Sequence, residues 1–160
     1  MKPLSLIIVR LRELSATLFL PLQSVLAIIG RFYVAWVFFA SGLTKIDDWE
    51  TTLFLFEYEY HVPVLPFVLS AYLATIAELF LPVLLALGFV SRISALGLGI
   101  VNIVAVISLE DIAAAALYGH IIWGLILLHI TVWGAGKLSL DYFTFGRVHS
   151  QDAQPRLATA

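Results

Sequence analysis

The chain contains no cysteine and few charged residues, and these two scarcities exclude several kinds of protein. Without cysteine it can form no disulfide, no thiolate metal site and no dithiol relay. Charged residues make up only 12% of the 160 residues, whereas ordinary soluble domains contain about a quarter. This leaves too little polar surface to cover a globule in water, so the composition indicates a membrane protein. Any redox function would require a bound cofactor or a partner protein.

The balance of charge is also small. The net charge of −2 gives no excess of basic side chains for a phosphate backbone, so we expect no nucleic-acid partner. The hydrophobic fraction is 61% and the mean hydropathy is +0.99. The length fits one domain, residues 1–160, and the lipid bilayer is its expected partner.

Four apolar stretches are long enough to cross a bilayer, whose hydrocarbon core of ~30 Å needs about 20 helical residues. They cover residues 27–43, 64–87, 93–109 and 117–135, approximately. Only helices and closed barrels satisfy their backbone groups in lipid, and the alternating strands of a barrel are absent from the sequence. We therefore predict an all-α fold, a membrane-embedded four-helix bundle.

The two ends of the chain differ from these spans. Residues 1–22 predict an amphipathic helix on the membrane surface, ending near Pro21. A signal peptide is disfavoured because Arg10 and Arg12 interrupt the short apolar run and no small-residue cleavage site follows. Residues 144–160 are polar and predict a flexible tail.

Lysine and arginine cluster on one side of the predicted membrane. Before the first span, between the second and third, and after the fourth the basic residues are Lys2, Arg10, Arg12, Arg92, Lys137, Arg147 and Arg156. The opposite side carries a single basic residue, Lys45, among many acids. Because cytoplasmic loops are enriched in Lys and Arg, the pattern predicts a multi-pass protein with both termini in the cytoplasm.

An acid stands in the middle of the second span. A carboxylate at the centre of a membrane helix costs about 2.5–3.5 kcal/mol, so Glu78 should face a partner. Counted at 1.5 Å per residue from the inner edge, Glu78 lies at about 13 Å, His129 at about 9 Å and Arg31 at about 6 Å. We predict a ligand-binding inner cluster in which Glu78 pairs with Arg31, joined by His129 and by Asn102 of the third span.

Pro82 strengthens this interpretation. Proline cannot donate to the carbonyl four residues earlier, which belongs to Glu78. A carboxylate and an unpaired carbonyl would thus share one turn beside a kink, and the sequence predicts a polar pocket there. The alternative is an ion pair that only fixes how the helices pack.

Other polar residues give weaker patterns. Lys45, His120 and Glu110 predict an outer polar cluster, with a solvated rim as the alternative. His120 and His129 lie nine residues apart and face opposite sides of one helix, which disfavours a haem. Glu57 and His61 are too few ligands for a metal site. We expect no metal and no intrinsic cofactor.

Several short motifs resemble the DoxX family of small four-span membrane proteins. They are GLTK at 42–45, AEL at 77–79, LGFVSR at 87–92 and GAGKLSLD at 134–141. Lys45, Glu78, Arg92 and Asp141 match by position, and Gly42, Gly136 and Ser139 complete the signature. The resemblance settles a chemical role for none of them.

The resemblance implies a four-helix bundle in a prokaryotic inner membrane. Relatives occur in terminal quinol oxidases and thiosulfate–quinone oxidoreductases, so it also implies an accessory subunit that binds a quinone or quinol. Such a subunit would work with a membrane or soluble redox protein. It would be enzymatic only as part of that assembly. The alternative is a non-catalytic scaffold, or a conduit for a small molecule, metal or peptide, with soluble partners.

Overall fold

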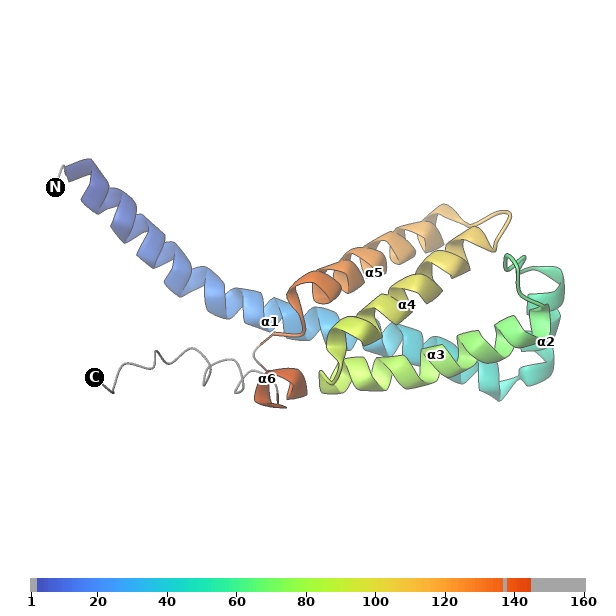
Figure 1. Ribbon diagram of the computed structural model, residues 1–160. Coiled ribbons are helices and arrows are strands. Elements are labelled where there is room, and N and C mark those ends of the chain that lie inside the picture. The colour runs from blue at the N-terminus through green and yellow to red at the C-terminus, as the bar shows by residue number, and fades with distance from the viewer. Residues whose placement is uncertain (1–2, 137, 145–160) are drawn as a thin grey trace, which may run out of the picture.

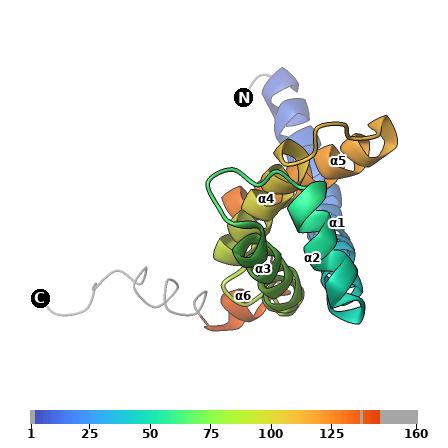
Figure 2. The same cartoon turned by 90° about the vertical axis from the view of Figure 1, so that its right-hand side faces the viewer.

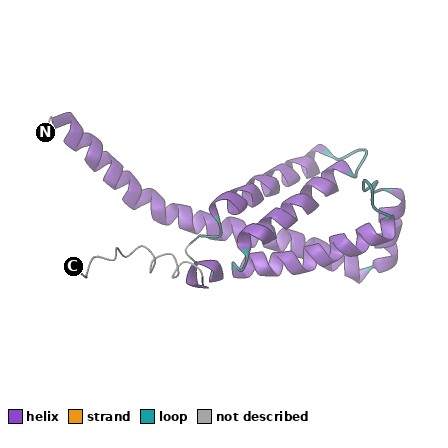
Figure 3. Cartoon of the chain, viewed as in Figure 1, coloured by secondary structure: helices purple, strands orange, loops and turns teal. Residues whose placement is uncertain are grey.

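The computed structural model describes residues 3–136 and 138–144, and every regular element in this part is a helix (Figures 1 and 3). The helices are α1 (Pro3–Asp47), α2 (Trp49–Tyr58), α3 (Phe67–Leu87), α4 (Ser91–Ile107), α5 (Ala114–Trp133) and α6 (Leu140–Thr144). The predicted all-α fold is confirmed.

Three helical segments are long and apolar enough to cross a membrane: Val25–Asp47 within α1, and the whole of α3 and α5. The 17-residue α4 is also apolar and reaches the lower limit of spanning length. Most apolar side chains of these helices point outward, and α5 buries only Leu127 and Ile130. An exposed apolar surface of this extent is suited to lipid rather than to water.

The four long helices pack in a ring. α1 contacts α3, α3 contacts α4, α4 contacts α5, and α5 returns to α1. Figure 2 shows this arrangement from the end that carries α2. The centre is filled by a small apolar core made of Val34, Ala35, Phe38, Leu85, Ala95, Leu98, Leu127 and Ile130.

The prediction that a surface helix ends at Pro21 is wrong. α1 continues through Pro21 as a single helix of 45 residues, and its N-terminal part extends beyond the bundle (Figure 1). A proline removes one backbone hydrogen bond and can kink a helix, but the apolar helix-forming residues on both sides continue it. That residues 1–22 lie on a membrane surface stays a prediction, and the predicted tail beyond Thr144 falls outside the described residues.

α2 forms between the first and second predicted spans, where no helix was predicted. Asp48 caps it: its carboxylate accepts hydrogen bonds from Thr51 N at 3.0 Å and from Thr51 Oγ1 at 2.6 Å. One face of α2 buries Thr52 and Phe56, and the Thr52 hydroxyl donates to the carbonyl of Lys45 at 3.0 Å. An Asp followed three residues later by Thr, with Glu50 in the first turn, is a helix-start signal that was present in the sequence.

The Asp48 cap predicts a pH dependence for α2. The Thr51 hydroxyl, and then its backbone N–H, lower the pKa of Asp48. The cap therefore contributes its full stabilisation above the ordinary pKa of an aspartate and loses it as pH falls through the lowered value. In an NMR titration, we expect the Asp48 midpoint to rise toward the ordinary range in Thr51→Val. Identical midpoints in the two proteins would show that the cap does not form.

Candidate functional site

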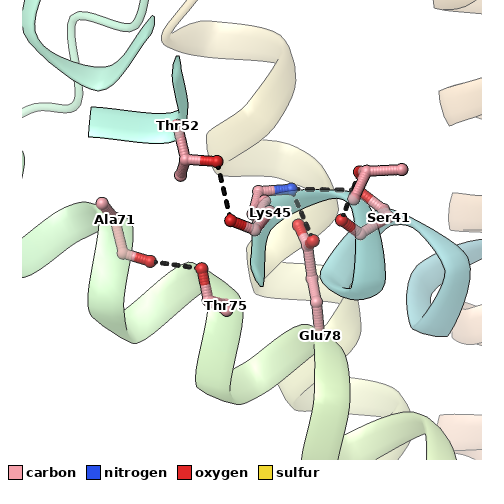
Figure 4. A network of polar contacts seen from close by, with 7 residues as sticks. Ser41, Lys45, Thr52, Ala71, Thr75 and Glu78 are labelled. Atoms are coloured by element: carbon pink, nitrogen blue, oxygen red, sulfur yellow. Dashed lines mark hydrogen bonds and ion pairs between the residues drawn. The ribbon is translucent and has the colours of Figure 1, made fainter. Parts of the chain in front are cut away.

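The acid of α3 pairs with the last lysine of α1 (Figure 4). Lys45 Nζ lies 2.6 Å from Glu78 Oε2 and donates to Ser41 Oγ at 2.9 Å. The Glu78 side chain is 8% exposed and that of Lys45 17%, so the pair is largely removed from its surroundings. The predicted need of Glu78 for a basic partner is met.

The partner, however, is not Arg31, and the predicted Glu78–Arg31 pair is wrong. Arg31 stands 14 residues before Lys45, a distance of about 21 Å along α1. It lies level with Gly88, where a Cβ would come within 2.8 Å of Arg31 Nη1, ten residues beyond Glu78 on the antiparallel α3. The sequence count failed because it placed a membrane edge near residue 27, where α1 has no end.

Gly42 sets the level at which α1 meets α3. A Cβ at this position would lie 2.9 Å from Leu79 Cδ2 and 3.1 Å from the carbonyl carbon of Glu78. Glycine therefore allows the two helices to approach closely beside the ion pair.

Tyr60, in the loop between α2 and α3, is also affected by Glu78. Burial raises the pKa of the Tyr60 phenol, and the negative charges of Glu78 and Glu59 raise it further.

Arg31 instead fastens the chain after α5 to α1. It is 3% exposed and donates to the carbonyls of Ala135 at 3.1 Å and Leu138 at 3.0 Å. Its Nε has no hydrogen-bond partner among the described residues. Charge-assisted hydrogen bonds to two carbonyls fix this connection in place.

Asp141 fastens the same connection to the α3–α4 turn. Its carboxylate accepts from Val90 N at 2.7 Å and Ser91 N at 2.8 Å, and its own N–H donates to Gly88 O at 2.9 Å. Ser139 donates to Gly136 O and accepts from Tyr142 N at the start of α6. We call Arg31, Gly88, Ser139 and Asp141 the α6 latch. The signature residues Gly136, Ser139 and Asp141 thus have a structural role here, because their hydrogen bonds hold the segment that leads into α6.

The predicted outer cluster of Lys45, His120 and Glu110 does not form either. His120 pairs with Asn102, not with Lys45: Asn102 Nδ2 donates to His120 O at 2.9 Å, and Asn102 Oδ1 lies 2.8 Å from His120 Nδ1. Because Oδ1 only accepts, His120 Nδ1 carries the hydrogen, which leaves Nε2 as the acceptor of the neutral ring. Glu110 is exposed and makes no ion pair within residues 3–136 and 138–144. Asn102 therefore does not join Arg31 either.

His129 lies in an apolar groove between α1 and α5. The groove has a volume of about 480 Å³. Its other lining residues are Phe19, Leu22, Leu26, Ala27, Gly30, Leu125, Ile126 and Ile130. The imidazole stacks on Trp133, with ring centroids 4.9 Å apart, and makes no hydrogen bond in the described part of the chain. The four residues predicted as one inner cluster thus occupy four separate environments.

A second hollow, of about 600 Å³, opens beside the α6 latch. It is bounded by the start of α4, the end of α5 and the segment leading into α6, and is lined by residues 90–93, 133–136, 139, 141 and 142. Arg92 is the basic residue among the described residues that line it. The sequence predicted Arg92 as a cytoplasmic basic residue and a signature position, but nothing in the pattern showed that α6 folds back to form a hollow beside it.

The DoxX family model matches residues 26–111, which is more than half of the chain. The chain belongs to the DoxX family. An uncharacterised protein of Haemophilus influenzae is 34% identical over 123 residues, which cover 71% of this chain and 80% of that protein. No solved structure matches the chain.

The matched DoxX region runs from within α1 to just beyond α4. It contains Gly42, the Lys45–Glu78 pair and Arg92, whereas α5 and the GAGKLSLD segment follow it. The ion pair thus belongs to the matched DoxX region. The groove beside His129 is formed partly by residues outside it.

Proposed function

We propose that this DoxX protein is a quinone- or quinol-binding accessory subunit of a membrane redox system, and that the groove beside His129 holds the quinone ring. The observation that supports this most directly is an imidazole without a hydrogen-bond partner, within the described residues, in an otherwise apolar groove. The family resemblance agrees with this proposal, because it implies relatives in quinol oxidases and thiosulfate–quinone oxidoreductases.

The groove fits a quinone in size and chemistry. Its volume of about 480 Å³ falls within the ~300–1,000 Å³ of small-molecule sites, which combine apolar walls with few polar groups. Ala27 and Gly30 have small side chains, so α1 leaves space in the groove. A Cβ at Gly30 would already lie 3.3 Å from Ile126 Cγ2. Phe19, Leu22 and Leu26 are exposed, so an isoprenoid tail can leave the groove into lipid.

His129 supplies the polar contact. An imidazole N–H donates to a carbonyl oxygen and the neutral ring accepts from a hydroxyl, so the same side chain recognises both quinone and quinol. A bound quinone would supply the two-electron redox chemistry. The chain has no cysteine and so cannot pass electrons through a dithiol, and we propose a membrane or soluble redox protein as its partner.

The location proposed with this function is a prokaryotic inner membrane, with the chain crossing it several times and both termini in the cytoplasm. The charge pattern along the sequence supports this orientation. It places His129, four residues before the end of α5, in the inner half of the bilayer.

A non-catalytic scaffold or conduit is the second candidate. It is favoured by the Lys45–Glu78 pair, whose charges satisfy each other, and by the α6 latch, in which Arg31 and Asp141 bond to backbone groups. The exposed acids of α2 and the following turn, Glu50, Glu57 and Glu59, would then contact a soluble partner. Co-purification with an oxidoreductase favours the redox subunit, whereas a partner without a redox cofactor favours the scaffold.

Replacing His129 by phenylalanine should weaken quinone binding about tenfold, the value of one hydrogen bond of ~1.4 kcal/mol. The measurement is quenching of tryptophan fluorescence by decylubiquinone in purified protein, since Trp133 stacks on His129. His61→Phe, an exposed histidine in the α2–α3 loop, is the matched control and should bind as the wild type does. Equal binding by the His129 variant, or no saturable binding at all, would remove the proposed site.

A further inference from the structure

We infer that the hollow beside the α6 latch binds the headgroup phosphate of an anionic phospholipid, with Arg92 as the residue that holds it. The inference is independent of quinone binding, because the hollow and the His129 groove have different linings and only the hollow contains Arg92.

Arg92 brings a positive charge to the lining of the hollow. Its side chain is exposed, and it has no hydrogen bond or ion pair within the described residues. The guanidinium lies against the backbone of Gly134, where a Cβ would be 3.6 Å from Arg92 Nε. Asp141 lines the same hollow, but its oxygens accept hydrogen bonds from the Val90 and Ser91 amides and make no ion pair with Arg92. A free guanidinium beside a hollow is suited to bidentate binding of phosphate.

The hollow lies at the depth of lipid headgroups. Trp133 is the last residue of α5 and Ser91 the first of α4, so two apolar helices end at its walls. Trp133 is 65% exposed, and tryptophan is enriched where membrane meets water. Basic pockets among membrane helices at this depth are suited to anionic headgroups.

An aliphatic stripe on α4 distinguishes a lipid from a soluble phosphate. It begins beside Arg92 and follows helical spacing along the outer face of α4, where each side chain is more than half exposed. Its members are Ile93, Leu96, Ile100, Ile103 and Ile107. A phosphate held by Arg92 therefore leaves an attached acyl chain lying along this stripe.

The test is lipid titration of the purified full-length protein in detergent, followed by native mass spectrometry. We expect the wild type to bind one phosphatidylglycerol more tightly than phosphatidylcholine. Arg92→Gln should lower the affinity for phosphatidylglycerol about fivefold, the contribution of one basic side chain at an anionic lipid surface. Its affinity for phosphatidylcholine should not change, and Arg92→Lys should keep part of the preference.

Arg10→Gln is the matched control, since Arg10 is exposed on the part of α1 that leaves the bundle, and it should keep the wild-type preference (Figure 1). The inference is overturned if Arg92→Gln and Arg92→Lys both bind phosphatidylglycerol as the wild type does. It is also overturned if millimolar glycerol 3-phosphate displaces the lipid, because the occupant would then be a soluble phosphate.

Discussion

Replacing Lys45 by methionine should lower the free energy of unfolding by about 3 kcal/mol, because it leaves the buried carboxylate of Glu78 without its cation. Methionine keeps the length and apolar stem of lysine, so the change removes the charge more than the packing. Ser41 would also lose the hydrogen bond that Lys45 donates to it. The measurement is urea unfolding in detergent micelles, followed by the helical circular dichroism signal.

The double variant Lys45→Met with Glu78→Met distinguishes the loss of the whole ion pair from the effect of leaving one buried charge without a partner. Replacing both members of a buried ion pair by apolar residues is often neutral, so the double variant should recover most of the lost stability. Recovery would show that the single variant fails because a charge is stranded. A single variant as stable as the wild type would contradict the pairing of Lys45 with Glu78 in solution.

The same double variant separates architecture from chemistry. Glu78 and Lys45 do not line the groove beside His129, so their removal should leave quinone binding unchanged. Loss of quinone binding in a stable double variant would move the site from the groove to the ion pair, and with it the functional meaning of Glu78.

The sequence predicts the helices but not which of their charged side chains pair with each other. Hydropathy located all four apolar helices, because each needs a long run of apolar residues regardless of its neighbours. The partner of Glu78 was ambiguous, since Arg31 and Lys45 lie on one stripe of α1. The choice depends on the register of α1 against α3, which Gly42 and Gly88 set through contacts with distant residues. Local pattern does not contain that register.

The sequence predicted His129 as a site residue but missed the groove around it for a related reason. The sequence placed His129 at an inner level of the membrane but could not show that the groove is formed by Phe19, Leu22 and Leu26, which precede the first predicted span. Because the sequence predicts a surface helix that ends near Pro21, it assigns Phe19 and Leu22 to the membrane surface. The continuous α1 brings it beside α5.

Substituting alanine at Gly88 should destabilise the protein by about 3 kcal/mol, the sum of a left-handed backbone and an overpacked contact. Gly88 ends α3 with φ +69° and ψ 34°, and a Cβ there would lie 2.6 Å from Ser139 Cβ and 2.9 Å from Ser139 Cα. Backbone atoms cannot turn aside as a flexible side chain does. Alanine must therefore push the α6 latch away from the end of α3.

Gly99→Ala is the matched control, and its effect should have the opposite sign. Gly99 lies within α4, and a Cβ there would meet nothing within 4 Å. Alanine in a helix interior is favoured over glycine by about 0.5–1 kcal/mol, so this variant should unfold at higher urea than the wild type. Proteolysis at the segment before α6 would report the latch itself, with faster cleavage expected in Gly88→Ala alone. Equal stability of the two variants would mean that the α6 latch does not rest on Gly88.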